Sequence, residues 1–277
     1  MMTNRISTSE WDPKREAMRL WNADPCGGAA GGAPEGSQDF FASIDRDRYG
    51  AYAPWLPSAG EFDRHSNEYL LEIGCGMGTD LASFARGGAR TVAVDLTTRH
   101  LSIAKQRLHG QGSPVRLVRS DGEILPFRDE TFDVVYSFGV LHHTPGTQTA
   151  IDEAYRVLKP GGRAIIAMYH RDSAFYWFYT IFIRGVLKAG LLRQGYRRLV
   201  ADIEQHDHTD ALPLVKVYSR GQLQRLFARF RFVETEVHHL QPSHFSYLAP
   251  IARRLPASWM DAASRHLGWY VFAKATK

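Results

Sequence analysis

The sequence predicts an α/β fold in which a mainly parallel sheet is covered by helices on both faces. Between residues 69 and 169, short apolar runs alternate with stretches of helical periodicity, and the first run ends in a glycine-rich turn. Strands that alternate with helices build parallel sheets, and continuous apolar strands of this kind are buried on both faces. The predicted strands are Tyr69–Ile73, Thr91–Asp95, Val115–Ser120, Phe132–Ser137 and Arg163–Met168.

The elements between and after these strands follow from the same periodicity. Within the alternating region, helices are expected at Asp80–Arg86, Arg99–Leu108 and Gln148–Val157. Beyond residue 169 the alternation stops, and residues 171–213 are expected to form an aromatic helical insertion. A further helix at Arg220–Phe230 and strands at Phe232–His238 and Trp269–Ala273 complete the prediction.

The segment before the first strand has a different character. A polar stretch around Trp11–Trp21 can form a helix, and it leads into the glycine-rich run Cys26–Pro34. Glycines lose much conformational entropy when they enter a helix or strand. We expect this run to be either a mobile linker or a loop that becomes ordered over a ligand.

Composition excludes several classes of protein. The 277 residues carry 34 basic and 29 acidic side chains, and the net charge of +5 is spread along the chain rather than gathered into the basic stripe typical of nucleic-acid binding. Two cysteines are too few for a disulfide framework. The longest apolar run, Ala174–Ile183, is half the length of a membrane span of about twenty residues. With no apolar signal core in residues 1–15, a cytoplasmic protein is expected.

The glycine-rich turn carries the first chemical signal. In the run Leu70-Leu-Glu-Ile-Gly-Cys-Gly-Met-Gly-Thr-Asp80, an apolar strand ends near an acid, Glu72, and three alternating glycines precede a helix. Glycines there permit a tight turn and close approach of a ligand to the backbone. A dinucleotide fingerprint has its third glycine where Thr79 stands, so the spacing disfavours a nicotinamide-dependent oxidoreductase. Alone, the turn could belong to any α/β nucleotide site.

Further signals follow in order along the chain. Asp95 ends the second predicted strand seventeen residues after Gly78, and Asp121 follows the third. The fourth strand continues into Ser137-Phe-Gly-Val-Leu-His-His143, and Arg156-Val-Leu-Lys-Pro-Gly-Gly162 leads into the fifth. Each feature alone has a structural explanation: either aspartate could cap a strand end, Cys75 could be a small buried filler, and residues 158–162 could be a turn.

Taken together, this series over about residues 69–170 resembles class I S-adenosylmethionine-dependent methyltransferases. It is similar to their large "type 11" group, which includes the ubiquinone and menaquinone methyltransferases. The resemblance implies a Rossmann-like, seven-stranded sheet whose last strand, at Gly268–Lys274, is antiparallel. It also implies S-adenosylmethionine as cofactor and S-adenosylhomocysteine as product. The implied cofactor contacts are Glu72, Gly74, Cys75, Gly76, Gly78, Asp95, Leu96, Asp121, Gly122, Glu123, Ser137 and Phe138.

In this resemblance each acid has a task. Asp95 would accept both ribose hydroxyls, for which a carboxylate offers two acceptor oxygens at one place. Asp121 would meet the adenine amino group, with Gly122 and Glu123 beside the ring. The sulfonium makes the methyl electrophilic, so transfer depends on positioning and desolvation and needs no metal.

A hydroxyl acceptor would need a base. His142 and His143 follow the fourth strand, at the edge where open α/β sheets bind ligands, and an imidazole titrates near pH 6.5. Tyr169 and His170 end the fifth strand at the same edge. All four stay candidates, beside the possibility that none moves a proton.

Other histidines raise the question of a metal. They lie in Glu204–Asp210 and at His238, His239 and His244. Neither group matches a recognised ligand spacing, so a solvated loop is the preferred interpretation and no metal is expected.

The aromatic insertion has three interpretations. Phe175–Tyr179 with Ile181 and Phe182 is apolar all around a helix and must be covered. It could pack beside the sheet, it could form a lid over an apolar acceptor, or, with basic residues between Arg184 and Arg198, it could touch a membrane surface. Tyr49, Tyr52 and Trp55 could close the cofactor pocket or simply pack.

The chain is thus expected to comprise an N-terminal cap (1–60), a cofactor-binding core (61–170), a helical lid insertion (171–219) and a C-terminal completion of the sheet (220–277). The preferred function is methyl transfer to oxygen, nitrogen or carbon of a small metabolite or natural product. Methylation of protein or RNA, and a cofactor-binding module without turnover, stay open. A loop typical of DNA amino-methyltransferases is absent at residues 137–140. The acceptor and the oligomeric state cannot be derived from the sequence.

Overall fold

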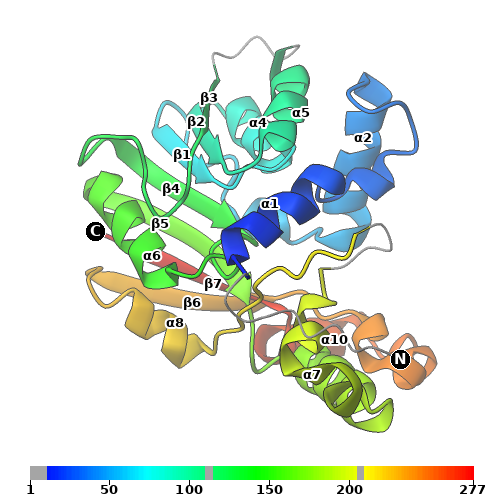
Figure 1. The fold of residues 1–277 in the computed structure, drawn as a ribbon. Helices are drawn as coiled ribbons and strands as arrows, with labels where there is room; N and C mark the ends of the chain where they lie inside the picture. Colours follow the sequence, from blue (N-terminus) through cyan, green and yellow to red (C-terminus); the bar gives the residue numbers. More distant parts are fainter. Residues whose placement is uncertain (1–10, 110–114, 205–208) are drawn as a thin grey trace.

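Seven strands form one mixed sheet in the computed structural model, which describes residues 11–109, 115–204 and 209–277 (Figure 1). The strand order is β3-β2-β1-β4-β5-β7-β6, and β1 to β5 run parallel. β7 is antiparallel to both of its neighbours. The strands are β1 (Tyr69–Ile73), β2 (Arg90–Asp95), β3 (Arg116–Arg119), β4 (Phe132–Phe138), β5 (Leu158–Tyr169), β6 (Phe232–His238) and β7 (Tyr270–Thr276). The predicted fold class, including the antiparallel last strand, is confirmed.

Helices cover both faces of the sheet because alternate residues of each strand point to opposite sides. On one face, Leu71 and Ile73 of β1 pack with α6 (Thr147–Val157) and α8 (Arg220–Leu226). On the other face lie α3 (Leu56–Ala59), α4 (Thr79–Arg86) and α5 (Thr98–His109). The remaining helices are α1 (Pro13–Ala23), η1 (Gly28–Gly31), α2 (Gln38–Arg46), η2 (Asp47–Tyr52), η3 (Phe175–Leu187), α7 (Gly190–Ala201), η4 (Pro242–Leu248), α9 (Ala249–Ala252) and α10 (Ala257–Leu267).

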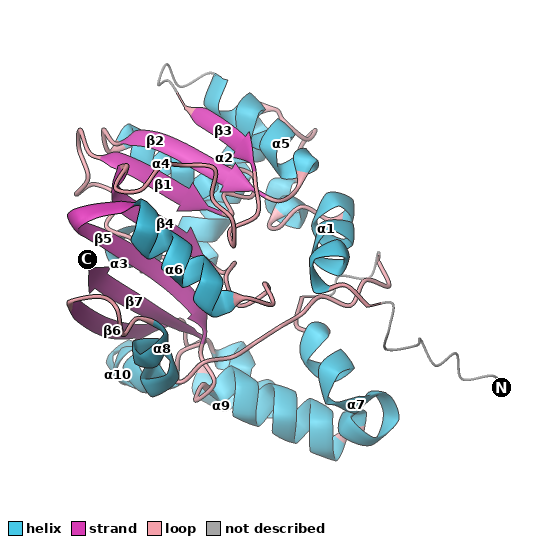
Figure 2. Cartoon of the chain, turned by 60° about the vertical axis from the view of Figure 1, so that its left-hand side comes forward, coloured by secondary structure: helices cyan, strands magenta, loops and turns pink. Residues whose placement is uncertain are grey.

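Two groups of helices lie beyond the two covered faces of the sheet. Figure 2 shows α1 beyond the carboxyl ends of the parallel strands, where a ligand of such a sheet is expected. The η3, α7, η4 and α9 helices form a second group at the end of the molecule opposite α5 and β3 (Figures 1 and 2). Among the described residues, no helix has both the length and the apolar character needed to cross a membrane.

The segment Leu158–Gly162, expected as a turn, belongs to β5 in the structure. Leu158 pairs with Phe132, and the register then shifts before Arg163 pairs with Val134. Gly161 absorbs the irregularity at a φ of +76°, and its N–H donates to the Lys277 carbonyl. The turn is therefore a bulge that β4 and the chain's last residues hold inside the sheet.

Candidate active site

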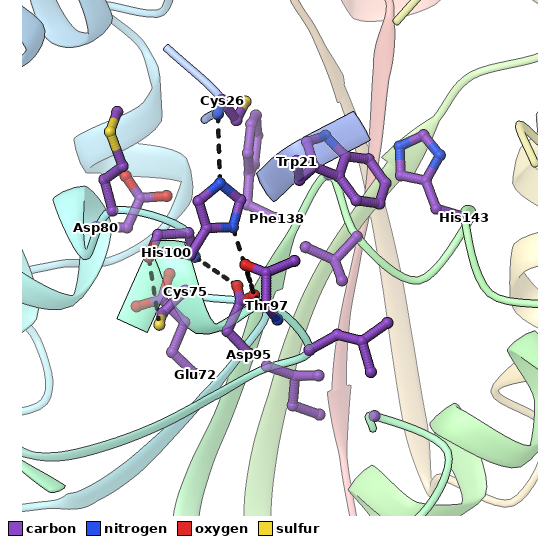
Figure 3. A pocket seen from close by; sticks show the side chains of 18 of the residues that line it. Trp21, Cys26, Glu72, Cys75, Asp80, Asp95, Thr97, His100, Phe138 and His143 are labelled. Atoms are coloured by element: carbon purple, nitrogen blue, oxygen red, sulfur yellow. Dashed lines mark hydrogen bonds and ion pairs between the residues drawn. The ribbon is translucent and has the colours of Figure 1, made fainter. Parts of the chain in front are cut away.

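A cavity of about 380 Å³ opens at the carboxyl ends of β1, β2 and β4. This is the point where the strand order reverses, between β1 and β4, and ligands of open α/β sheets bind at such a point. The N-terminal segment covers it: α1 lies beyond the strand ends (Figure 2), and Trp21 and Cys26 are among the lining side chains (Figure 3). Further lining residues come from η2. The covering residues are Lys14, Ala17, Trp21, Cys26, Gly27, Asp47, Arg48 and Tyr52.

The glycine-rich loop lines the floor of this cavity. Gly74, Gly76 and Gly78 all have positive φ, at +76°, +52° and +74°, a conformation that other residues adopt at a cost. A side chain at Gly74 would also place its Cβ 2.4 Å from Val140, whereas nothing lies within 4 Å of the corresponding position at Gly76. Gly74 is thus needed for packing, and Gly76 leaves its surroundings open to a ligand.

Glu72 lies beside this loop with an unsatisfied carboxylate. The side chain is buried, and its Oε2 atom has no hydrogen-bond partner among the described residues. Burial raises the pKa of this carboxyl well above its usual range, and the negative charge of Asp80 adds to the effect. A buried acceptor without a partner is costly, so the site is suited to a ligand that brings a donor.

Asp95 holds the loop from the neighbouring strand. Its Oδ2 accepts from the Gly76 N–H at 2.9 Å, and its Oδ1 accepts from the N–H and Oγ1 of Thr97, both at 2.9 Å. His100 lies 3.4 Å from Oδ1 through Nδ1, and its Nε2 accepts from the Cys26 N–H (Figure 3). These donors lower the pKa of Asp95 despite its burial. The carboxylate is therefore charged and fixed at the cavity wall.

Asp121 and Glu123 approach the cavity from the loop after β3, and α1 meets them there. Lys14 Nζ lies 2.5 Å from Asp121 Oδ2 and 2.9 Å from Glu123 Oε2. Glu123 also accepts from Thr144 Oγ1 and the Gly146 N–H. Asp121 and Gly122 line the cavity, whereas Glu123 joins its rim to α6. α1 is therefore tied to the acids that flank the adenine position in the resemblance above.

A second charged cluster joins η2 to the start of α4. Asp80 is buried and accepts from Arg48 at 2.7 and 2.6 Å in a bidentate ion pair. The hydroxyls of Tyr49 and Tyr136 donate to the same carboxylate at 2.9 Å. Both charged groups line the cavity next to the glycine loop. The pair fixes the N-terminal segment to the core because breaking it would leave a buried charge uncompensated.

Three polar side chains meet at the far wall of the cavity. Tyr169 donates a short hydrogen bond to Glu204 Oε1, and His143 Nε2 lies 3.9 Å from the same oxygen. His143 Nδ1 lies 2.8 Å from the Leu214 carbonyl, which can only accept, so Nδ1 carries a proton. Burial lowers the pKa of His143 although Glu204 opposes this. Nε2 therefore presents a lone pair next to the cavity.

Comparison with known proteins agrees with this geometry. Residues 71–166 match the family model described as a methyltransferase domain. The chain carries a class I S-adenosylmethionine-dependent methyltransferase domain.

The similar proteins are named for methyl transfer to different acceptors. A demethylmenaquinone methyltransferase of Clavibacter sepedonicus is 40% identical over 102 residues, which are 36% of this chain and 41% of that protein. A sterol 4-C-methyltransferase of Caenorhabditis elegans is 33% identical over 110 residues, 39% of this chain and 33% of that protein. The chain therefore spans less than half the length of either relative. A structure of Haemonchus contortus phosphoethanolamine N-methyltransferase 2 with phosphomonomethylethanolamine and S-adenosylhomocysteine shares the fold, at a TM-score of 0.56 and 18% identity, over 84% of this chain and 57% of that one.

The methyltransferase domain brings most of the predicted site residues to one cavity, but not all of them. Eleven of the sixteen line it: Glu72, Gly74, Cys75, Gly76, Asp95, Leu96, Asp121, Gly122, Phe138, His143 and Tyr169. Gly78 begins α4 and packs on Ala104, and Ser137 Oγ donates to the Ile73 carbonyl. His170 contacts the Gly268 carbonyl away from the cavity. These residues support the site rather than line it.

His142 has an unusual environment within the domain. It is fully buried, neither ring nitrogen has a hydrogen-bond partner among the described residues, and its ring centroid lies 3.8 Å from that of Tyr169. Burial lowers its pKa well below the usual range. Among the described residues, His142, His143 and Glu204 are the group whose ligand atoms could hold a metal ion, all within 4.8 Å of one another. Our expectation that the site needs no metal stays a prediction.

The histidine group near the start of η4 differs from expectation. His239 and His244 are buried, and their rings contact those of Tyr52 and Phe175, so the prediction of a solvated loop for them is wrong. These aromatic contacts come from helices far apart in the sequence, so local residue spacing does not predict them. Residues 205–208 of the other histidine run lie outside the described residues.

The aromatic run of the insertion packs beside the sheet. Phe175 contacts Trp269 and His244, and Tyr176 bonds to the Tyr196 hydroxyl. No residue from 175 to 182 lines the cavity. The covering role falls to α1 and the loop after it, while the insertion contributes Glu204 just beyond α7.

Sequence reasoning missed Arg48, Asp80, His100 and Lys14, and it assigned Glu204 to a solvated loop although this residue lines the cavity. Asp80 and His100 follow the recognised motifs by a few residues, so a closer inspection of the helix starts could have found them. Arg48 and Lys14 lie far along the chain from their partners, and no local pattern marks them.

Proposed function

We propose that this chain is an enzyme that transfers the methyl group of S-adenosylmethionine to oxygen, nitrogen or carbon of a small-molecule acceptor. The observation that carries the proposal is one cavity with two unlike halves. One half holds the glycine loop with Glu72 and Asp95, and the other holds His143, Tyr169 and Glu204 among aromatic rings.

The polar groups in the first half of the cavity match the parts of S-adenosylmethionine. The unpartnered Glu72 oxygen would accept from the ammonium group of the methionine part, whose positive charge would also return the Glu72 pKa towards its usual range. Asp95 would hold the ribose, and Asp121 with Gly122 the adenine. When bound, S-adenosylmethionine supplies an electrophilic methyl group on a sulfonium.

The second half suits an acceptor that must lose a proton. The Nε2 lone pair of His143 is available because the Leu214 carbonyl fixes the proton on Nδ1. Glu204 would stabilise the imidazolium once His143 takes a proton, as a carboxylate 3.9 Å away. Trp21, Phe138 and Tyr270 line the same cavity, so aromatic surface would desolvate the reacting groups.

The size and cover of the cavity favour a small acceptor over protein or RNA. Its volume is about 380 Å³, within the range of small-molecule sites. α1 lies over it and is tied down by the Lys14 pairs and by an N–H from Leu212 to Glu16 at 2.7 Å. A polymer would have to displace these contacts.

Labelled methyl transfer tests the proposal. Purified protein is incubated with S-adenosylmethionine carrying an isotopic methyl label and with a metabolite extract or a macromolecular fraction. We expect label in the small-molecule fraction, and its loss by roughly a hundredfold in His143→Gln if a proton must move. Label in protein or RNA alone would replace the small-molecule proposal. No transfer from a preparation that binds the cofactor would favour the silent binding module.

A further inference from the structure

The helices η3, α7, η4 and α9, together with the start of α10, carry exposed apolar side chains that the reaction does not use. Of the fourteen large apolar side chains that are most exposed among the described residues, eleven lie in residues 175–201 and 242–259. We call the surface that they form the apolar-basic face. Its apolar side chains are Trp177, Phe182, Val186 and Leu187 on η3, Leu192 and Tyr196 on α7, Tyr247 and Leu248 on η4, Ile251 on α9, Leu255, and Trp259 on α10.

The exposure is greatest at the tip between η3 and α7. Leu192 is 90% exposed, Leu187 61% and Val186 57%. Scattered single leucines on a surface need no explanation, but several on one helical tip do. The tip projects from the end of the molecule in both views (Figures 1 and 2). Burying these exposed apolar side chains against another surface would lower the free energy of the protein.

The charges of the same segments have one sign. Residues 175–201 contain five basic and no acidic side chains, and residues 242–259 contain two basic and no acidic ones. Arg184 pairs with Asp202, and Arg197 lies over the Trp11 ring. Four exposed cations, Lys188, Arg193, Arg253 and Arg254, have no acidic partner within the part of the chain that the structure describes. The face therefore attracts anions.

We propose that the apolar-basic face docks on membrane surfaces that contain anionic lipids. Lysine and arginine beside leucine and aromatic side chains is the pattern of helices that lie in the headgroup region. Tryptophan and tyrosine favour that interface because they offer an apolar ring and a polar group. A second copy of the chain fits less well, since a symmetric contact would bring like charges together. The inference stands independently of the methyl acceptor.

Vesicle sedimentation tests this docking. The full chain is mixed with vesicles of phosphatidylcholine alone or of phosphatidylcholine and phosphatidylglycerol in equal parts. We expect sedimentation with the mixed vesicles, weakened by added salt, and little with phosphatidylcholine alone. The double variant Lys188→Glu, Arg193→Glu should bind the mixed vesicles at least tenfold more weakly, because each cation near such a surface contributes about fivefold. Leu192→Ser should weaken binding with the charge unchanged.

The matched control reverses two cations at the opposite end of the molecule. Lys105 and Arg116 are exposed on α5 and β3, so Lys105→Glu, Arg116→Glu changes the net charge equally. It should bind within twofold of wild type. Equal losses in both double variants would show attraction by net charge and overturn the proposal, as would absence of vesicle binding. Self-association of wild type that the Leu192→Ser variant abolishes, without vesicle binding, would assign the face to a second copy instead. Unchanged thermal unfolding confirms that each variant is folded.

Discussion

The two ring nitrogens of His143 face different partners, and this difference defines what the residue can do. Nδ1 is committed to the Leu214 carbonyl, while Nε2 lies beside Glu204 and the cavity. Burial is the largest influence on its pKa and lowers it, Glu204 raises it, and Lys216 lowers it. A neutral ring at neutral pH is what a proton acceptor needs.

These opposing influences predict how the His143 pKa responds to substitution. Glu204→Gln removes a negative charge and should lower the pKa, whereas Lys216→Met removes a positive charge and should raise it. Nuclear magnetic resonance titration of histidine-labelled protein measures both without an acceptor. The wild-type ring should be neutral at neutral pH and gain its proton only on the acidic side of the ordinary value near 6.5. A shift of the same sign in both variants would contradict the assignment.

Chelation tests the expectation that no metal is required. His142, His143 and Glu204 are close enough to coordinate a metal ion, but the proposed chemistry uses His143 as a base without a bound metal. Dialysis against a chelator should therefore change neither the affinity for S-adenosylhomocysteine nor the melting temperature. A drop in melting temperature that zinc restores in wild type but not in His142→Ala would contradict this.

At the residue scale, sequence could predict the acids and glycines of the core because each lies at a strand end that local pattern marks. Asp95 and Asp121 end consecutive strand units, and parallel strands bring such ends to one edge. Arg48, Lys14 and Glu204 reach the cavity from segments outside the alternating region. Their place depends on how the N-terminal segment and the insertion fold back, which no spacing in the sequence encodes.

At the scale of elements, α1 is the cover of the cavity. Its N-cap, Asp12, accepts from the Lys14 N–H at 3.0 Å, and Lys14 in turn reaches the acids beside the adenine position. Loss of an N-cap costs about 1 kcal/mol of helix stability. The cover should therefore loosen when this cap is removed, while the sheet stays intact.

Asp12→Ala should raise the Kd for S-adenosylhomocysteine by about fivefold, the equivalent of that cap free energy. The matched control is Ser219→Ala, which removes the capping box of α8 on a helix that does not line the cavity. It should lower stability similarly and leave the Kd unchanged. Calorimetric titration measures both. An equal effect of the two variants would mean that α1 does not cover the bound cofactor.

Element types inside the core were predictable because apolar periodicity there is uninterrupted, and β1 and β6 have the predicted bounds. β5 starts five residues earlier than predicted, at Leu158 instead of Arg163. Pairing of Leu158 with β4 and backbone hydrogen bonds between the two glycines and Lys277 override the preference of Pro160 and these glycines for a turn. The insertion was predicted as a helical lid, whereas the aromatic residues 175–182 do not line the cavity. Its aromatic rings are apolar on all sides, so periodicity gives no buried face.

At the scale of the whole molecule, buried histidines couple stability to pH. Burial lowers the pKa of His239 to about 4 and that of His244 to about 3. The unfolded chain takes up these protons near pH 6.5 and the folded chain does not. Their contribution to stability is therefore complete above pH 6.5 and is lost as the pH falls towards the folded values.

For His239 alone, this linkage predicts a loss of about 2 kcal/mol in the free energy of unfolding between about pH 7.5 and about pH 5. Urea unfolding at the two pH values measures it. His239→Gln should reduce the pH dependence by about that amount, whereas His266→Gln, at an exposed position on α10, should leave it unchanged. A wild-type protein equally stable at both pH values would contradict the burial of these rings.

The cavity at the ends of β1 and β2 is proposed to bind S-adenosylmethionine through the glycine loop and Asp95. Isothermal titration with S-adenosylmethionine, S-adenosylhomocysteine and NAD, on wild type and on Asp95→Ala, tests this most directly. We predict binding of the two sulfur ligands but not of NAD, weakened about a hundredfold in the variant by the loss of two charged hydrogen bonds. Binding of NAD alone, or equal affinity in a folded Asp95→Ala variant, would contradict the account.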